Sequence, residues 1–392
     1  MTAPKTIRVK AGDQLKLTLK NSLTMPLGNE VENEFRLPNT TNMHLHGGHI
    51  SGESPGDNVL IMVGPGETEE YIYDFPKNHA PGTHWYHPHS HGSTSIQTGQ
   101  AVAGMLIVED PPGYLPDQIA NMPEIPMMIQ HLHLEELFKY ANQSGLTWFD
   151  YQNIQIDYTN ATSESGNTNM MLVNMQYIPK ITVEKGKWYR LRMVMSSVLD
   201  GLAWTAPPGC DLMLLAKDGI YLQDAPRSVS TMILAPGNRA DVAIRCNIDP
   251  GIYKMPTVSR GQYFEPISPN DLGFDVPATC GFCGTQPYVA ALKVVAGSGE
   301  PEPDLKPFGA ELERPCYLTD LTQVPDDEIG EQFDIDYGYG LCFTVNGVCW
   351  NASFSRNYSL GTVQQSYLVN NGVHPHHQRK PQYFQLIIIR IP

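Results

Sequence analysis

Apolar and polar residues alternate along much of the chain, and this alternation predicts β-strands rather than helices. In the stretch TIRVKAGDQLKLTLKNSL, apolar residues take alternate positions on both sides of a Gly-Asp turn, which indicates a β arm or hairpin. The stretch VLIMVGPGETEEYIYDFP repeats this arrangement around a Pro-Gly turn, and AVAGMLIVED reads as a short apolar strand. Because no long amphipathic helix interrupts this pattern, we expect an all-β protein.

The predicted strands group into consecutive units. The Pro-rich segment PPGYLPDQ marks the end of the first unit, which we place at residues 1–112. A second unit at 122–297 repeats the order of apolar strand, Gly-containing turn and alternating strand. Residues 298–336 are rich in Pro, Asp and Glu and are expected to form a linker. Residues 337–392 would begin a third unit that is too short to close like the others, which leaves an open sheet edge.

Composition agrees with this fold class and narrows the possible partners. The 34 Gly and 32 Pro residues are scattered along the chain, as expected for the many turns of β-sandwiches or barrels. A formal net charge of −15 argues against nucleic acid, because neutralising phosphates requires clustered Lys and Arg. No apolar run is long enough to cross a bilayer, so we expect neither a nucleic-acid nor a membrane partner.

Glycosylation triplets favour a secreted, extracellular or periplasmic glycoprotein, although Met1 leads almost directly into the first predicted strand without a visible signal segment. The five Asn-X-Ser/Thr triplets begin at Asn39, Asn142, Asn160, Asn351 and Asn357. The seven cysteines are Cys210, Cys246, Cys280, Cys283, Cys316, Cys342 and Cys349. The lone Cys-X-X-Cys at 280–283 predicts a local disulfide or two loop thiols more readily than a zinc site.

Two His-X-His pairs carry the candidate chemistry. Alternate residues of a strand face the same side, so His44 and His46 should point together, and so should His87 and His89. Two such strands in one unit can direct four imidazoles to one locus, and imidazole is a ligand for copper, zinc, iron and nickel. Neighbouring aromatic and glycine residues suit a rigid site, with rings beneath it and close approach of the backbone; they are Trp85, Tyr86, Gly47, Gly48 and Gly92.

The remaining histidines of the first two units are assigned supporting roles. We expect each to support the site from behind the ligands or to be structural: His49, His79, His84 and His91. His131 and His133 form a third His-X-His, but nothing around them in the sequence resembles a site, so a structural role is expected. A zinc hydrolase is a poor alternative, because no nearby Glu has the spacing of a general base in the known zinc motifs.

The first unit, from NMHLHGGHIS to AVAGMLIVED, resembles the first cupredoxin domain of the multicopper oxidases, the laccase and cuproxidase group. The segments VNMQYIPKITVEKGKWYRLRMV and APGNRADV resemble the second domain, and FTVNGVCW and GTVQQSYLVNNGVHPHH resemble the start of the third. The resemblance implies consecutive cupredoxin-like Greek-key β-sandwich or barrel domains, with the third incomplete. It also implies copper as the cofactor.

The resemblance assigns individual copper ligands. It implies that His44 binds the type 2 copper and that His46, His87 and His89 bind the type 3 pair. In the segment HPHHQR, it implies that His374 is a type 1 ligand and His377 a type 2 ligand, while Arg379 stands where a type 3 histidine is usual. Asp57 lies where family members carry an acid near the cluster, which suggests a proton relay or a residue that orients bound water. An exposed turn aspartate is the alternative.

The sequence departs from the family pattern after its third-unit motif. The family completes its site with a late His-Cys-His segment, but every cysteine of this sequence precedes His374. A blue copper centre requires a thiolate, and Arg379 carries a positive charge and cannot bind copper. Three explanations stay open: an incomplete gene sequence, a partner chain that completes the third domain, or a protein that has lost catalysis.

Together these features predict a multicopper oxidase-type oxidoreductase. The intact system would oxidise a phenolic or metal-ion substrate and reduce dioxygen to water, while the chain as written would be inactive alone. The alternative is a non-catalytic copper-binding or structural extracellular protein that retains the fold.

Overall fold

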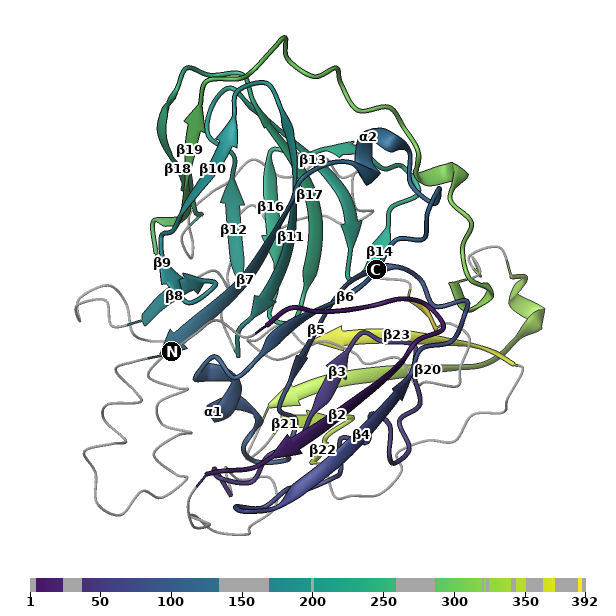
Figure 1. Ribbon diagram of the computed structural model, residues 1–392. Helices are drawn as coiled ribbons and strands as arrows, with labels where there is room; N and C mark the ends of the chain where they lie inside the picture. Colours follow the sequence, from purple (N-terminus) through teal and green to yellow (C-terminus); the bar gives the residue numbers. More distant parts are fainter. Residues whose placement is uncertain are drawn as a thin grey trace.

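The computed structural model describes 5–23, 37–133, 169–198, 201–258, 286–318, 321, 324–339, 343–349, 362–370 and 387–389. Within these residues the secondary structure is almost entirely β, so the all-β prediction is confirmed (Figure 1). The two α-helices are short, α1 (Thr94–Gly99) and α2 (Asp117–Ala120). No described helix has the length and hydrophobicity that crossing a bilayer requires.

Strands of the first unit form two layers around one apolar core. The four-stranded sheet has the order β1-β6-β5-β3, and its strands are β1 (Ile7–Val9), β3 (His44–His46), β5 (Gly82–His87) and β6 (Gly104–Val108). The second layer is the antiparallel pair β2 (Gln14–Lys20) and β4 (Thr68–Asp74). The leucines of β2 alternate toward the core, where Leu45, Tyr71, Tyr73 and Leu106 are buried.

The second unit is built on a larger sheet with the order β14-β13-β17-β11-β7-β8-β9, in which β15 also pairs with β13. Its strands are β7 (Glu124–His133), β8 (Asn169–Val173), β9 (Gln176–Tyr177), β11 (Trp188–Ser196), β13 (Cys210–Lys217), β14 (Ile220–Tyr221), β15 (Arg227–Ser228) and β17 (Arg239–Cys246). Two further sheets, β10-β19-β18 and β12-β16, accompany it. Their strands are β10 (Lys180–Glu184), β12 (Leu202–Thr205), β16 (Thr231–Leu234), β18 (Gly251–Pro256) and β19 (Tyr288–Val295). A disulfide joins Cys210 to Cys246 across β13 and β17.

Residues 298–336, predicted as a linker, contain short helices and the start of a strand. They contain the short 3-10 helices η1 (Gly309–Glu311), η2 (Cys316–Leu318) and η3 (Asp326–Glu328). Strand β20 (Ile329–Tyr339) then begins inside the range predicted as linker. Acidic residues alternate with apolar ones in FDIDYGY, which is a period-two strand pattern. The linker prediction relied on the acidic composition of this region and did not take that alternation into account.

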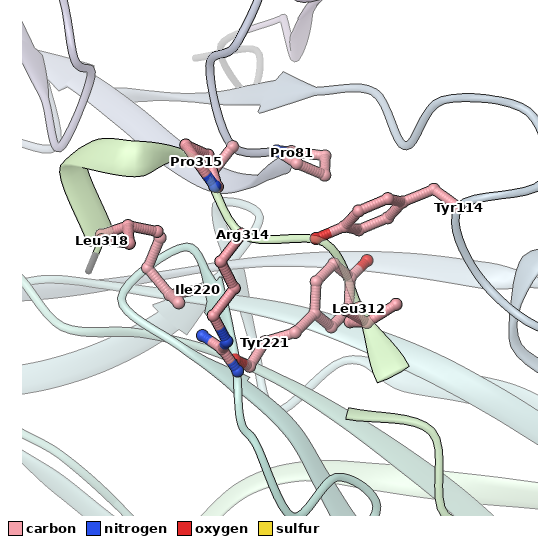
Figure 2. Close-up of a pocket in the computed structure, with 9 residues that line it drawn as sticks. Pro81, Tyr114, Ile220, Tyr221, Leu312, Arg314, Pro315 and Leu318 are labelled. Carbon is pink, nitrogen blue, oxygen red and sulfur yellow. The ribbon is translucent and has the colours of Figure 1, made fainter. Parts of the chain in front are cut away.

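The segment around η1 and η2 packs between the first two units. Figure 2 shows Arg314 reaching toward Tyr221, with Pro81 and Tyr114 on the other side of the small pocket that they line. The guanidinium of Arg314 donates a hydrogen bond to the carbonyl of Tyr221, and the hydroxyl of Tyr317 accepts one from the backbone N–H of Ala80. The predicted linker therefore holds the two units against each other.

Strand β20 belongs to a five-stranded sheet of order β22-β21-β20-β23-β24, with β21 (Phe343–Val345), β22 (Val348–Cys349), β23 (Val363–Asn370) and β24 (Ile387–Ile389). Several sequence features lie outside the described residues: Cys280, Cys283, Cys342, Asn142, Asn160, Asn351 and Asn357.

Buried charges at the seam between the first two units fix the start of β5, the strand that carries His87. The hydroxyl of Thr83 donates to Asp241 of β17 at 2.6 Å. The guanidinium of Arg192 donates to both Thr83 and Asp241, and Arg190 pairs with the same carboxylate. Each of these groups has partners of opposite charge or polarity, as buried charges require.

Candidate metal centre

Strands β3 and β5, which carry the candidate ligands, are antiparallel neighbours. Their register places His44 opposite His87 and His46 opposite Trp85. Side chains directly opposite each other on one face of such a pair have their Cβ atoms about 5 Å apart, which suits two imidazoles around one ion. Pairing of the two histidine segments therefore follows from the strand register.

One detail of the predicted arrangement is wrong. Strand β5 ends at His87, so His87 and His89 do not share a strand. Pro88 follows His87 and has no backbone N–H to continue the ladder. The backbone N–H of His89 instead donates to the side-chain oxygen of Asn42 at 2.6 Å.

Three buried imidazoles converge at the end of these strands. Each of His44, His46 and His87 offers a ring nitrogen, and the three nitrogens lie within 4.8 Å of one another. Nδ1 of His46 lies 3.2 Å from Nε2 of His87. Two nitrogens bound to one tetrahedral ion at about 2.0 Å would lie about 3.3 Å apart, so this separation fits a shared metal ion.

Hydrogen bonds fix which nitrogens face the centre. Nδ1 of His44 lies 2.9 Å and 3.0 Å from the two carboxylate oxygens of Asp57, which leaves Nε2 as the nitrogen available to a metal ion. Nδ1 of His87 lies 2.8 Å from the carbonyl of Pro88, which makes it the protonated nitrogen and leaves the lone pair on Nε2. The donor set of neutral imidazoles therefore fits copper.

Asp57 is an internal residue, so the alternative of an exposed turn aspartate is wrong. The residue is 1% exposed, and one of its oxygens also accepts the backbone N–H of Leu45 at 2.8 Å. Its carboxylate thereby joins the ring of His44 to the backbone of the same strand. Such a partner fixes the orientation of a metal-binding imidazole and raises its basicity.

The ring of His89 lies next to this group. Its centroid is 5.1 Å from that of His44 and 5.9 Å from that of His87. Asn42, which holds the backbone of His89, is itself fixed by hydrogen bonds to the carbonyls of Val59 and Ile61. The fourth predicted imidazole is therefore close to the three that converge.

Of the two aromatic residues predicted beneath the site, one lies there. The Trp85 indole stacks on His87 with a centroid distance of 4.1 Å and on His46 at 4.9 Å. Tyr86 alternates to the other face, where its hydroxyl donates to the carbonyl of Lys5. Trp85 is buried with Met105, Ile107 and other apolar residues, which gives the two imidazoles a rigid base.

Three other histidines of the first unit, His49, His79 and His84, are held by hydrogen bonds, ring stacking or burial. Nε2 of His79 accepts the backbone N–H of His49, and its Nδ1 donates to the carbonyl of Ala80. Burial lowers the pKa of His79 to about 4, and burial also lowers the pKa of His49, whose ring stacks on Tyr317. His84 is fully enclosed; burial first, and the charge of Arg239 next, hold its pKa well below the usual value.

Third-unit ligands predicted from the sequence lie outside the described residues. They are His374, His377 and the neighbouring Arg379.

The seam around β5 contains residues that the sequence analysis did not single out. Arg190 and Arg192 alternate with apolar residues in WYRLRMVMS, and Arg239 and Asp241 do so in RADVAIRC. All four are buried. Charges at alternate positions of an otherwise apolar strand are the signal that could have found them, because such charges are buried only when paired.

Family models match two parts of the chain. A multicopper oxidase model matches residues 2–113, and a second multicopper oxidase model matches residues 134–266. The chain belongs to the multicopper oxidase family. Members of this family carry copper, which is the ion that the imidazoles of β3 and β5 suit.

Individual relatives support this family assignment. This multicopper oxidase family member is 26% identical over 246 residues to multicopper oxidase mco of Staphylococcus aureus, and the match covers 61% of this chain and 46% of that protein. It is 27% identical over 401 residues to a laccase of Bacillus stratosphericus, covering 96% and 71%. It is 25% identical over 248 residues to cell division protein FtsP of Haemophilus influenzae, covering 62% and 44%. The chain spans about half the length of most of these relatives.

Solved structures agree on the fold. The multicopper oxidase from Campylobacter jejuni, described as a metallo-oxidase, aligns with a TM-score of 0.59 at 19% identity. The alignment covers 94% of this chain and 69% of that one. The McoA multicopper oxidase 2F4 variant of Aquifex aeolicus gives the same TM-score at 19% identity, covering 94% and 72%. At this identity the likeness concerns the fold.

Proposed function

We propose that this protein is a multicopper oxidase-type oxidoreductase, which couples oxidation of a phenolic or metal-ion substrate to reduction of dioxygen to water. The observation that carries the proposal is the convergence of three buried imidazoles, with His46 and His87 facing each other at 3.2 Å. Copper, when bound, would supply the electron transfer from reductant to dioxygen. The proposed ligands are His44, His46, His87 and His89, with His374 and His377 from the third unit.

Residues of the chain would prepare this centre in two ways. Asp57 would hold His44 in one tautomer, so that Nε2 is always available to the metal. The same buried carboxylate is also the proposed proton relay, because reduction of dioxygen to water consumes protons next to the metal. Trp85 would exclude water from behind His46 and His87.

A location outside the cytoplasm is part of the proposal. The disulfide between Cys210 and Cys246 supports it, since such bonds persist in oxidising compartments. Glycosylation of the Asn-X-Ser/Thr sites would accompany secretion. A partner chain that completes the third domain belongs to the same proposal.

A non-catalytic copper-binding or structural role is the second candidate. It is supported by Arg379, which stands where the family pattern has a histidine. The similarity to a protein named for cell division rather than oxidation points the same way.

Copper loading and oxygen uptake test the two candidates together. The purified protein would be loaded with Cu(II), dialysed, and analysed for copper per chain, for an absorption band at about 600 nm, and for oxygen consumption with hydroquinone, Fe(II) or Cu(I). The chain alone should bind copper without the blue band, because no cysteine follows His374. The oxidase predicts the band and consumption of oxygen with at least one reductant once a partner chain supplies the missing thiolate. Bound copper with neither the band nor oxygen uptake in that complex would favour the second candidate. A protein that retains no copper would overturn both copper-dependent functions.

A further inference from the structure

Arg239 belongs to the second unit, but its side chain is buried against the metal-binding strands of the first. Its guanidinium donates to the backbone carbonyl of Asp218 at 2.8 Å and to those of Gly237 and Thr83 at 3.3 Å each. Thr83 is in β5, the strand that ends at His87. The side chain therefore joins two turns of the second unit to a ligand-bearing strand.

The same guanidinium lies directly behind the other ligand-bearing strand. Gly47 follows His46 in the chain and has a φ of +95°. A Cβ on Gly47 would lie 2.3 Å from Nη2 of Arg239 and 2.9 Å from Nδ1 of His84, so no side chain fits there. The guanidinium and the imidazole thus occupy the space against the backbone next to His46.

His84 completes this packing from the opposite side. A Cβ on Gly219, in the second unit, would lie 2.7 Å from Cε1 of the His84 ring. His84 is consequently confined between Gly47 and Gly219, with Arg239 beside it.

The ion pair of Arg239 compensates only weakly for the cost of burying its charge. Its carboxylate partner Asp218 is 45% exposed and 3.3 Å away, so solvent weakens the attraction that compensates burial. Burial accordingly lowers the pKa of Arg239. Asp241 adds a Coulombic attraction, but burial still lowers the pKa, so this guanidinium is poorly explained by stability alone.

We propose that Arg239 is a positioning residue for the copper centre: it fixes the backbone after His46 so that the imidazole faces His87. The inference rests on the proposed copper site. A planar fork with several donors can hold three carbonyls and fill the space at Gly47 together, whereas the ammonium of lysine is a point charge.

Arg245 provides a matched control in the same strand. It lies six positions after Arg239, an even number, so both side chains lie on the same face of β17, and both are buried. Arg245 pairs with Asp211 and Asp304 and lies 4.5 Å above the Trp188 ring. All of these partners follow residue 121, away from β3 and β5.

The experiment compares Arg239→Gln, Arg239→Lys and Arg245→Gln in the full chain. Copper(II) affinity would be measured by competition with a chelator, the ligand field by electron paramagnetic resonance, and folding by thermal unfolding of the apo protein. We expect Arg239→Gln to weaken copper binding about 10- to 100-fold and to change the resonance spectrum, since support behind a ligand has effects of this size. Arg239→Lys should recover part of the loss.

Arg245→Gln should lower the melting temperature but leave copper affinity and the spectrum unchanged. If Arg239→Gln does not fold, Arg239→Lys decides, because it keeps the charge but loses the planar fork and should show a smaller spectral change of the same kind. Unchanged copper binding in both Arg239 variants, or an equal loss in Arg245→Gln, would overturn the positioning role while leaving the copper site intact. A wild-type protein that binds no copper would overturn the site and the positioning role together.

Discussion

The chain contains the tripeptide His-Leu-His twice, at 44–46 and at 131–133, and both copies lie in β-strands. The first copy forms the short strand β3, whose paired neighbour β5 ends in another histidine. The second ends β7, deep in the large sheet, where His131 pairs with Met171 and His133 with Asn169. Identical local sequences therefore have different cross-strand neighbours.

Whether a His-X-His pattern can form a metal centre therefore depends on the residues that surround the two imidazoles in the folded protein. His44 has an imidazole opposite and a buried carboxylate on its other nitrogen. His131 is equally buried, but the residues opposite are a core methionine and its neighbours. A strand supplies parallel side chains, while the partner strand and the residues behind it decide whether those side chains share an ion.

The largest expected effect tests the comparison directly. Replacing His46 by Ala removes one of two nitrogens 3.2 Å apart, and replacing His131 by Ala removes a ring from the second copy. We expect His46→Ala to weaken copper(II) binding more than about 100-fold, beyond the effect of losing a supporting residue. His131→Ala should leave copper per chain unchanged and lower the free energy of unfolding by about 1–3 kcal/mol.

Copper content by mass spectrometry and unfolding in urea measure the two effects separately. The distinction between the copies would be lost if His131→Ala released as much copper as His46→Ala.

Sequence patterns were sufficient for the fold class and for the set of converging imidazoles. Period-two alternation placed most of the strands, and the spacing of His44, His46 and His87 predicted three imidazoles that the structure brings together. The alternation also predicted that His87 and His89 point together from one strand, but β5 ends at His87, before Pro88, which has no N–H to continue the ladder.

The residues behind the ligands could not be predicted from local patterns. Arg239 and Thr83 are 156 positions apart, and only the packing of the two units brings the guanidinium to this carbonyl. The start of β20 was missed because acidic composition and strand alternation coincide in the same residues. Pairings of this kind depend on tertiary structure, which no local period encodes.

His79 is a third kind of histidine in this molecule, because both of its ring nitrogens form hydrogen bonds within the protein. His79 accepts from the backbone of His49 and donates to Ala80, and its pKa is lowered to about 4 from 6.5, mainly by burial. The unfolded chain takes up a proton at about 6.5, so stability should fall as the pH drops from 6.5 to 4. A shift of this size corresponds to about 3 kcal/mol of unfolding free energy.

His79→Gln should reduce the dependence of the unfolding free energy on pH between 6.5 and 4. The variant should retain copper, since neither ring nitrogen of His79 is available to bind a metal ion. Guanidinium unfolding of the apo protein at pH 7, 5 and 4 measures the profile. His49→Gln removes a half-buried histidine and should flatten it less. An unaltered profile in His79→Gln would show that another group controls the acid limit.

The smallest of these effects concerns the buried carboxylate of Asp57 behind His44. Asp57→Asn keeps the size of the side chain but removes the charge that fixes Nδ1 of His44. We expect copper(II) affinity to fall about 10- to 100-fold, as for other carboxylates that support a metal-binding imidazole. Chelator competition measures the change, and Asp13→Asn is the control, because Asp13 caps an exposed turn through the N–H of Lys10. Equal affinities in the two variants would mean that strand register alone, without the carboxylate of Asp57, orients His44.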